Sequence, residues 1–248
     1  MTGAAAAPTL LTMAAIAHWS FDRAAVIGDL HGRLDLLDEL LDRLDDRQLV
    51  VIGDVIDRGP DSGSVVERLI SRSAVGVRGN HEEWMLAWLR GEGLDEWAIK
   101  PKMGGLATLR SYGVTGETRG EIEPQRWRIL ADHRRFFESL ALIGDLVVDG
   151  TAYWLIHAGV PVHISLRGVP FEQVVPWLAE HHGKELLWST NDPEAMPPLD
   201  RSVIMGHQPR EEPLDTGDVL AIDTGAGTSE GGRLTALLLP ERTFETVG

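Results

Sequence analysis

The chain has 248 residues, 43% of them hydrophobic and 25% charged, and this balance is typical of a soluble globular protein with a buried core. Its formal net charge of −15 argues against binding to a nucleic-acid backbone or to an anionic membrane surface, because both need clustered Lys and Arg. The absence of Cys excludes disulfides, thiolate nucleophiles and Cys-ligated zinc. A chain without Cys is compatible with the cytoplasm, where we expect it to reside.

The first half of the chain begins with a short lead-in and then alternates strands and helices. Residues 1–20 lack the basic start of a signal peptide and are interpreted as irregular. Apolar runs predict strands at 24–27, 49–52 and 74–77. Apolar residues at helical spacing predict helices between them, at 33–44 and 62–71. This alternation predicts an α/β layer with parallel strands.

The second half changes character twice. Residues 82–140 are interpreted as a helical insertion whose Trp side chains, including Trp97 and Trp127, belong to the core. After it, a hairpin is predicted around Asp149-Gly150, followed by strands in RSVIMGH, VLAIDTG and RLTALLLP. No linker divides the chain, so we expect one domain over 1–248. The fold predicted is α/β, with two sheets packed face to face and helices outside.

Similar polar motifs occur at the ends of five predicted strands. They read GDLHG (28–32), GDVIDRG (53–59), RGNHE (78–82), IHAG (156–159) and MGHQP (205–209). In parallel α/β layers the carboxyl ends of strands share one edge, so side chains far apart in the sequence can meet there. One such motif alone could be an ordinary turn or a buried histidine. Five of them in succession favour a common site.

The side chains that would meet there offer oxygen and imidazole ligands without sulfur. They are Asp29, His31, Asp54, Asn80, His157 and His207. Such ligands suit Mn²⁺, Fe or Zn²⁺ better than Ca²⁺, which prefers oxygen alone. Six groups exceed the roughly three protein ligands of a mononuclear catalytic site, but they suit two metals that share a carboxylate. Two metals ~3.5–4 Å apart can hold a hydroxide for in-line attack on phosphorus.

The ordered set GDxHG, GDxxDRG, RGNHE, HAG and GH resembles the phosphoprotein phosphatase branch of the calcineurin-like metallophosphoesterases. The likeness is greatest to bacterial and bacteriophage serine/threonine protein phosphatases and to the related symmetrical diadenosine tetraphosphate hydrolases. It runs from Gly28 to Gly227, which is most of the chain. The resemblance implies a two-sheet sandwich flanked by helices. It also implies two divalent metal ions, with Mn²⁺ expected first and Fe or Zn²⁺ as alternatives.

The resemblance implies a role for each matching residue. The metal ligands would be Asp29 and His31 for the first ion, Asp54 as the bridge, and Asn80, His157 and His207 for the second. His81 would be the general acid, and Asp57 would orient its imidazole. Arg58, together with Asn80, would bind the substrate phosphate. These roles suit the chemistry, because a poor alkoxide leaving group needs a proton and Arg pairs well with phosphate oxygens.

The sequence departs from the family pattern in two places. The bacterial phosphatases tend to carry a second phosphate-binding Arg where this chain has Thr190. Either another Arg replaces it, with Arg201 and Arg167 as candidates, or the phosphate is held less tightly. In KPKMGGLATLRSYG, Met103 stands where these enzymes tend to have Asn. Both changes leave the metal ligands intact and affect the expected substrate preference.

Three functions are consistent with these observations. The first is a phosphomonoesterase of the serine/threonine protein phosphatase type, with a metal-bridging hydroxide as nucleophile. The alternative is a symmetrical diadenosine tetraphosphate hydrolase. A catalytically silent protein that binds phosphorylated partners would be expected to lack a metal ligand or the acid His, and this chain has them all. The expected partners are a phosphorylated protein or a small phosphoester. The sequence is silent on oligomeric state.

Overall fold

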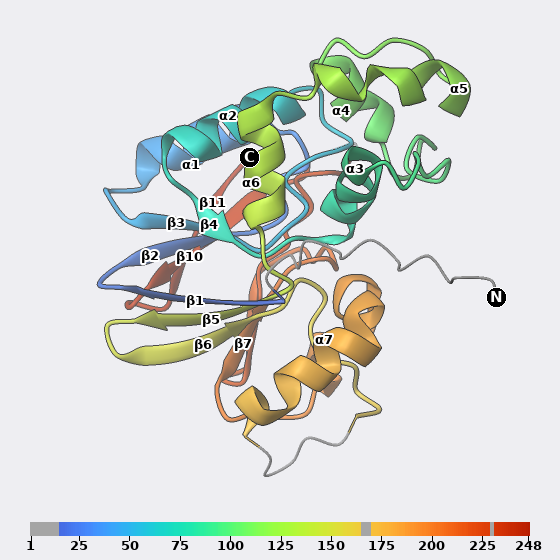
Figure 1. Ribbon diagram of the computed structural model, residues 1–248. Helices are drawn as coiled ribbons and strands as arrows, with labels where there is room; N and C mark the ends of the chain where they lie inside the picture. The colour runs from blue at the N-terminus through green and yellow to red at the C-terminus, as the bar shows by residue number, and fades with distance from the viewer. Residues whose placement is uncertain (1–14, 165–169, 229–230) are drawn as a thin grey trace, which may run out of the picture.

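A computed structural model of the chain contains two β-sheets stacked face to face with helices on both outer faces (Figure 1). It describes residues 15–164, 170–228 and 231–248. This arrangement confirms the predicted α/β class with a two-sheet sandwich flanked by helices.

The two sheets are mixed, and each contains a group of parallel strands. Sheet A has the order β1-β5-β6-β7-β9-β8 and sheet B the order β11-β10-β2-β3-β4. The strands of sheet A are β1 (Ile16–Phe21), β5 (Ile143–Val148), β6 (Thr151–Leu155), β7 (Ser202–Met205), β8 (Leu214–Asp215) and β9 (Val219–Ala221). Those of sheet B are β2 (Ala24–Ile27), β3 (Gln48–Val51), β4 (Val75–Gly76), β10 (Leu234–Leu239) and β11 (Thr243–Val247). Parallel pairs join β2, β3 and β4 in one sheet and β6, β7 and β9 in the other.

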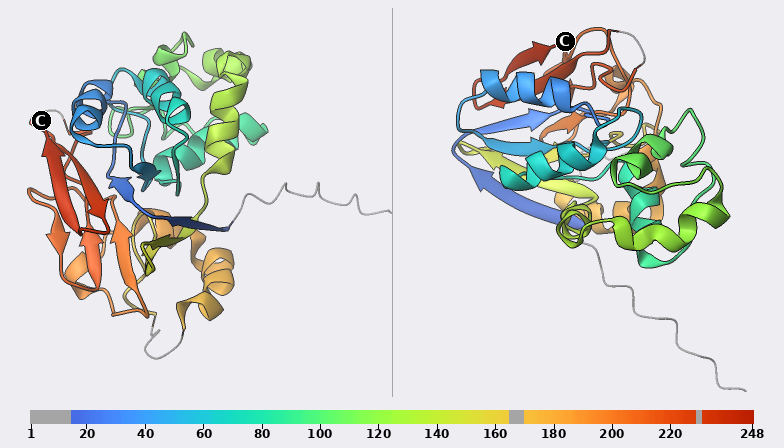
Figure 2. Two further views of the ribbon diagram at one scale, coloured as in Figure 1. Left: turned by 90° about the vertical axis from the view of Figure 1, so that its left-hand side faces the viewer. Right: turned by 90° about the horizontal axis from the view of Figure 1, so that it is seen from above.

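Seven helices accompany the strands in the part of the chain that the structure describes. They are α1 (Leu34–Arg43), α2 (Ser62–Ser71), α3 (Asn80–Arg90), α4 (Gly105–Ser111), α5 (Arg119–Ile122), α6 (Ala131–Ser139) and α7 (Phe171–Trp188), with short 3₁₀ turns at Glu123–Arg128 and Pro193–Ala195. Figure 2 shows α1 and α2 on the outer face of sheet B, and α7 on the far side of the molecule against sheet A. Helices α3 to α6 gather at one end of the sandwich.

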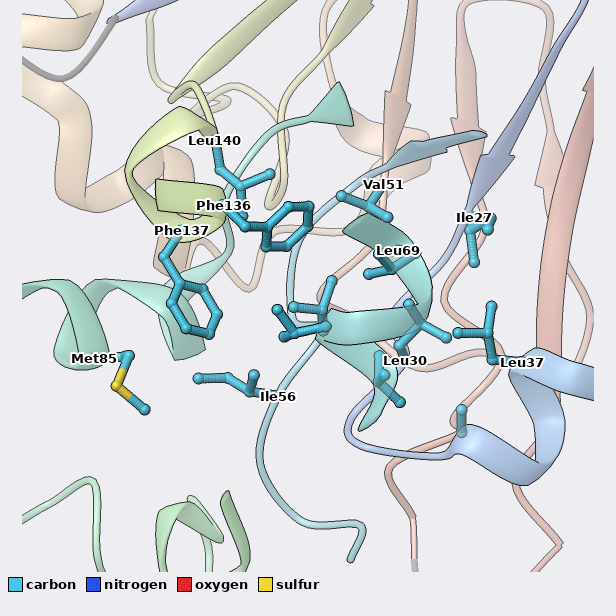
Figure 3. Packing of buried hydrophobic residues seen from close by; sticks show 14 of the residues in the cluster. Ile27, Leu30, Leu37, Val51, Ile56, Leu69, Met85, Phe136, Phe137 and Leu140 are labelled. Carbon is cyan, nitrogen blue, oxygen red and sulfur yellow. The ribbon is translucent and has the colours of Figure 1, made fainter. Parts of the chain in front are cut away.

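Alternation along the strands explains the layers. In β2, Val26 faces the core between the two sheets, whereas Ala25 and Ile27 face the core under the helices. Strand side chains point alternately to opposite faces, so a continuously apolar strand must be covered on both. Figure 3 shows Ile27 and Val51 directed toward Leu37 of α1 and Leu69 of α2. Fully buried positions of this kind hold the strand ends, and therefore the loops after them, in place.

Some sequence-based expectations were wrong. Residues 16–20 belong to β1, which pairs in parallel with β5. The segment IAHWSF is only half-buried, so it lacks the strongly apolar signal of the inner strands. Trp97 and Trp127 are exposed by 48% and 74%, and neither belongs to the core. Along the described residues, no helix combines the length and apolar character needed to cross a membrane.

Candidate functional site

The five polar motifs converge because each follows a strand of a parallel group. GDLHG, GDVIDRG and RGNHE follow β2, β3 and β4, while IHAG and MGHQP follow β6 and β7. Among the described residues, two groups of buried ligand atoms arise there, each with its atoms within 4.8 Å of one another. One group is His31, Asp54 and His81, and the other is Asp54, His157 and His207. The carboxylate of Asp54 is the member that the two groups share.

The two oxygens of Asp54 face different neighbours. Oδ1 lies 3.4 Å from Nε2 of His157. Oδ2 lies 3.7 Å from Nε2 of His31 and 3.7 Å from Nε2 of His81. The carboxylate is 2% exposed. A carboxylate whose oxygens point to two ligand groups has the geometry that a bridge between two cations needs.

Backbone carbonyls fix two of the imidazole rings. Nδ1 of His31 donates to the carbonyl oxygen of Ile56 (3.0 Å), and Nδ1 of His157 donates to that of Ile52 (2.9 Å). When one ring nitrogen donates in this way, the other is left to act as a ligand. Both Nε2 atoms therefore face the shared carboxylate, which is the arrangement of metal-ligating histidines.

The remaining candidate ligands lie around this centre. Oδ1 of Asn80 is 3.2 Å from Nε2 of His157, and Nδ1 of His207 is also 3.2 Å from that atom. Both oxygens of Asp29 accept the backbone N–H of His207, at 3.1 and 3.2 Å. Such a cluster of lone-pair donors, buried and without sulfur, fits divalent cations that accept nitrogen and oxygen ligands. The residues present thus fit the divalent metal ions that the resemblance implied.

His81 and Asp57 form a buried pair beside the ligand cluster. Nδ1 of His81 donates to Oδ2 of Asp57 at 2.7 Å, and the ring is 1% exposed. Asp57 is held in turn by Nε1 of Trp84 (2.7 Å) and the hydroxyl of Thr108 (2.6 Å). Burial disfavours the imidazolium, but the Asp54 and Asp57 carboxylates outweigh that effect and the pKa of His81 is raised. The pair can therefore hold a proton at Nε2, on the side of the cluster.

Arg58 and the start of α3 add positive character near that proton. The guanidinium Nη2 of Arg58 lies 3.3 Å from Nε2 of His81. Asn80 and His81 are the first two residues of α3, and the backbone N–H of His81 donates to Oδ1 of Asp54 (3.1 Å). A helix N-terminus carries partial positive charge and favours bound anions. An anion at this position would meet Arg58, His81 and the helix start together.

The backbone itself is unusual at the site. Among the described residues, the non-glycine residues with positive φ are His31, Asp54, Asp57, Arg58, Ser73, Asp149, His207 and Arg242. Five of these eight are candidate site residues. The left-handed region is costly for residues with a Cβ and is used at functional sites where the surrounding structure enforces it. The backbone conformation at these five positions favours glycine, but the chain has side chains there that can bind metal, phosphate or a proton.

Without metal ions, the pKa values indicate that a proton is bound to one of the candidate ligands next to Asp54. Burial lowers the pKa of His157, but the Asp54 carboxylate and its hydrogen bond outweigh this and raise the pKa to about 10. Burial raises the pKa of Asp54, and the neighbouring histidines overcome this and hold it well below its usual range. Burial and the positive charge on His157 lower the pKa of His207 to about 4. Positive charge is therefore favoured beside Asp54.

Several residues that position the site were missed in the sequence. The fully buried carboxylate of Glu82 accepts backbone N–H groups from Asp54 (2.8 Å), Val55 (2.9 Å), Ile56 (3.4 Å) and Gly79 (2.8 Å). Glu82 stands in the quoted RGNHE motif, at the third position of α3, from which its side chain reaches back to the backbone N–H of the N-cap residue Gly79. That spacing was the signal that could have identified it. Thr108 carries no comparable sequence signal.

The segment IDTGAG, after β9, also borders the site. Burial is the main influence on Asp223, and it raises the pKa of that carboxyl to about 6. A Cβ on Gly227 would lie 2.3 Å from the His31 ring, so only glycine fits there. The segment therefore forms a wall beside His31.

The candidates for a second phosphate-binding Arg do not fill that role in the described residues. Arg201 lies directly before β7, at the opposite end of the strand from His207, and its Nη1 donates to Asp145 (2.5 Å). The expectation for Arg201 was wrong, because Arg201 lies at the amino-terminal end of β7 and the site lies at the carboxyl end of that strand. Arg167 lies outside the described residues. Thr190 is exposed and Met103 is buried.

Comparison with known proteins places this chain in a family. A model described as calcineurin-like phosphoesterase matches residues 23–241. The bis(5'-nucleosyl)-tetraphosphatase PrpE [asymmetrical] of Oceanobacillus iheyensis is 25% identical over 259 residues, which cover 90% of each chain. The serine/threonine-protein phosphatase 1 of Salmonella typhimurium is 45% identical over 65 residues, which cover 25% of this chain and 30% of that one.

Solved structures show the same fold. A crystal structure described provisionally as a diadenosine tetraphosphatase superposes with a TM-score of 0.63 at 19% sequence identity. The match covers 94% of this chain and 97% of that one. At this identity the likeness extends to the fold.

Proposed function

Because the chain belongs to the calcineurin-like phosphoesterases, which are hydrolases of phosphoester bonds, we propose that it cleaves a phosphoanhydride bond in bis(5'-nucleosyl) polyphosphates. The cleavage proposed is asymmetrical, giving a nucleoside triphosphate and a nucleoside monophosphate. The names of relatives that align over nine-tenths of the chain support this order of preference. The sequence alone placed protein phosphatase first and named the symmetrical reaction as the alternative.

The observation that carries the proposal is a basic cleft beside the site, with a volume of about 900 Å³. Among the described residues, its charged lining residues are Arg33, Arg58, Lys100, Lys102 and Arg110, with no Asp or Glu. Gly227, whose Cα adjoins the His31 ring, also lines the cleft, so the cleft reaches the ligand cluster.

Three of these cations are free to bind an anion. Arg58, Lys100 and Lys102 have no carboxylate partner among the described residues, whereas Arg33 is paired with Asp35 (2.7 Å) and Arg110 with Glu117 (3.4 Å). In a chain of net charge −15, such a concentration of cations favours an anionic ligand. A single phosphoryl group occupies little of a cleft of about 900 Å³, whereas a tetraphosphate chain offers several anionic groups to it.

The residues of the site supply binding and proton transfer. Two divalent cations at Asp29, His31, Asp54, Asn80, His157 and His207, with Mn²⁺ proposed first and Fe or Zn²⁺ as alternatives, would offset phosphoryl charge and generate a nucleophile from water. Arg58 binds oxygens of the scissile phosphoryl group, together with Asn80. His81, oriented by Asp57, gives a proton from Nε2 to the leaving oxygen. General acid catalysis of this kind contributes roughly 10²–10⁴-fold.

Product analysis tests the proposed reaction. The protein, depleted of metal and re-supplied with Mn²⁺, is incubated with diadenosine tetraphosphate, and the nucleotides are separated by chromatography. We expect equal amounts of ATP and AMP. ADP as the sole nucleotide product would indicate symmetrical cleavage instead, and the asymmetrical proposal would be wrong.

A serine/threonine protein phosphatase is the second candidate. It is favoured by the 45% identity to the Salmonella phosphatase over 65 residues. A phosphothreonine peptide and a phosphotyrosine peptide in the same assay separate the two candidates. If kcat/KM for the phosphothreonine peptide exceeds that for diadenosine tetraphosphate, the second candidate replaces the first.

A further inference from the structure

A second pocket adjoins the ligand cluster on the side of Asn80. Its volume is about 440 Å³, within the range of small-molecule sites. Three tryptophans, Trp84, Trp97 and Trp188, line it, and we call it the tryptophan pocket. It is continuous with the site, because Asn80 lines it and the Trp188 ring makes an edge contact with the His207 ring at 6.4 Å between centroids.

Two of these tryptophans expose much of their surface without a structural reason. Trp97 is 48% exposed and Trp188 is 38% exposed, whereas Trp84 is buried and bonded to Asp57. Trp side chains are highly buried on average, and exposed aromatic surface inside a concave site marks a place for an apolar or aromatic ligand. The flat face of a nucleobase suits such walls, since stacking of a base on an aromatic side chain is worth ~1–3 kcal/mol.

The charged residues that line the two pockets indicate which part of the substrate each pocket binds. In the part of the chain that the structure describes, two carboxylates, Glu83 and Asp95, line the tryptophan pocket, and none lines the basic cleft. Glu83 pairs with Arg78 (3.0 Å), and Asp95 accepts the backbone N–H of Trp97 (2.9 Å). Phosphates would be repelled by these carboxylates and attracted to the cleft. Lys184 is the one cation among the described residues that line the tryptophan pocket.

We propose that the tryptophan pocket holds the nucleobase attached to the scissile phosphate, with Trp97 and Trp188 as its stacking walls. This inference rests on the proposed function. The base lies on the Asn80 side, and the rest of the polyphosphate runs past Arg58 into the basic cleft. The substrate therefore has a fixed direction across the site. The phosphorus nearest the held nucleoside sits at the ligand cluster.

That direction accounts for asymmetrical cleavage. Water adds to the α-phosphorus, and the bond from this phosphorus to the oxygen that bridges to the β-phosphorus breaks. The bridging oxygen leaves with the three remaining phosphates toward the cleft, and His81 lies on that side, next to Arg58. One water is consumed, and the products are a nucleoside monophosphate and a nucleoside triphosphate. The tryptophan pocket on one side of the ligand cluster and the basic cleft on the other thus select the phosphoanhydride bond between the α- and β-phosphates.

The test compares substrates with and without a base. Trp97→Ala and Trp188→Ala are assayed on diadenosine tetraphosphate and on inorganic tetraphosphate, which carries a similar anionic chain and no base. Trp177→Ala is the matched control, because Trp177 lies on the same helix as Trp188, is 44% exposed and does not line the pocket. We expect kcat/KM for diadenosine tetraphosphate to fall roughly 5- to 150-fold in the two pocket variants, following the size of base stacking. Inorganic tetraphosphate and the control variant should change by less than about twofold.

A binding measurement separates this inference from the proposed function. The dissociation constant of AMP is measured by calorimetry for the Mn²⁺-loaded wild type and variants. Weaker AMP binding in both pocket variants supports the pocket even if diadenosine tetraphosphate is not a substrate. Unchanged AMP binding and unchanged kcat/KM in both variants would overturn the pocket while leaving asymmetrical cleavage intact. A loss confined to phosphothreonine peptides would instead make the pocket a peptide site and overturn the proposal.

Discussion

His81 and Asp57 show how single residues acquire a function from their neighbours. Asp57 receives hydrogen bonds from His81, Trp84 and Thr108, so its carboxylate is fixed in position. Nδ1 of His81 is thereby oriented, and Nε2 is left facing the cluster at 3.7 Å from Asp54. The ring is close to the ligand atoms, but we propose that it serves as the acid and not as a ligand.

The substitution His81→Asn separates these two roles. Turnover should fall by at least ~10²-fold, the size of a general acid contribution. Aryl phosphates should lose less than phosphothreonine peptides, because aryl leaving groups need less protonation. Steady-state kinetics on both substrates and metal analysis by mass spectrometry are the measurements.

Metal content decides between the roles. It should stay at the wild-type value in His81→Asn, as it should in the control His18→Asn, whose exposed ring pairs with Asp145 far from the site. If the His81 variant lost metal in proportion to its activity, His81 would be a ligand and its assignment as the acid would be wrong.

Among single residues, the sequence identified the candidate ligands that the structure brings together, and it missed the residues that support them. His31, Asp54 and His157 stand in strand-end motifs, and the structure brings them together. Thr108 touches Asp57 only because α4 packs there, and its neighbouring residues give no sign of it. Residue type identifies a ligand, whereas a supporting contact depends on tertiary packing.

The candidate site is built from strand ends and from the first turn of α3, which is hydrogen-bonded to the loops after two of these strands. Glu82, in the first turn of α3, accepts backbone N–H groups from the turn after β3 and from Gly79. One side chain therefore connects the loops after β3 and β4. Asp54, Asp57 and Arg58 are all carried by the first of these loops.

Replacing Glu82 by Gln should destabilise the fold. A side-chain amide has one acceptor oxygen, so at least one of the backbone donors loses its charged partner, at a cost of about 1.5–3 kcal/mol per bond. Thermal unfolding of the metal-free protein measures this. Glu83→Gln is the matched control on the same helix, because its partly exposed pair with Arg78 should contribute less than ~1 kcal/mol. Equal loss in both variants would show that Glu82 has no special role.

Element prediction succeeded where burial was complete, and it missed three of the four edge strands, namely β1, β8 and β11. The helix at 62–71 and the strand at 24–27 have the predicted bounds, because their apolar pattern is strong. The half-buried β1 and β11 lie at sheet edges and were not predicted, since one side of each strand faces no neighbour strand. Local sequence cannot show which polar segment a sheet will recruit.

The molecule as a whole is acidic, yet its few lysines surround one site. The chain has three lysines, Lys100, Lys102 and Lys184, and all three line the basic cleft or the tryptophan pocket. Membership of the metallophosphoesterase family, expected from the ordered motifs, is confirmed by the match over 23–241. Neither pocket was predicted from the sequence, because each is assembled from segments that are separate along the chain.

Removing the lysine charges should weaken polyphosphate binding selectively. In the double variant Lys100→Ala, Lys102→Ala, KM for diadenosine tetraphosphate should rise at least about fivefold, since hydrogen bonds to charged groups are worth ~1.5–3 kcal/mol. KM for an aryl phosphate should change by less than about twofold, because a monoester at Arg58 has no further phosphate to offer to the two lysines. Added salt should raise KM in the wild type more than in the variant.

The surface control is Arg134→Ala, Arg135→Ala on α6, which removes two exposed cations that pair with Glu138 and Asp132. Its KM values should match the wild type. An equal rise of KM in both double variants would attribute the effect to net charge and not to the cleft.

Metal binding should release protons. In the metal-free chain the pKa of His157 is raised to about 10, so its imidazole is charged near neutral pH, whereas coordination requires the neutral ring. Binding should therefore release at least about one proton per chain, and metal affinity should rise with pH. Calorimetric titration in buffers of different ionisation enthalpy measures the number. A value of zero would contradict the charged state of His157.

The central claim is that Asp54 lies between two cations held by the ends of five strands. Metal-to-protein stoichiometry by mass spectrometry, combined with anomalous diffraction from Mn²⁺-loaded crystals, tests it most directly. The account predicts two ions per chain, one on each side of Asp54, and loss of at least one in Asp54→Asn. A single ion in the wild type, or two ions and full activity in the variant, would contradict it.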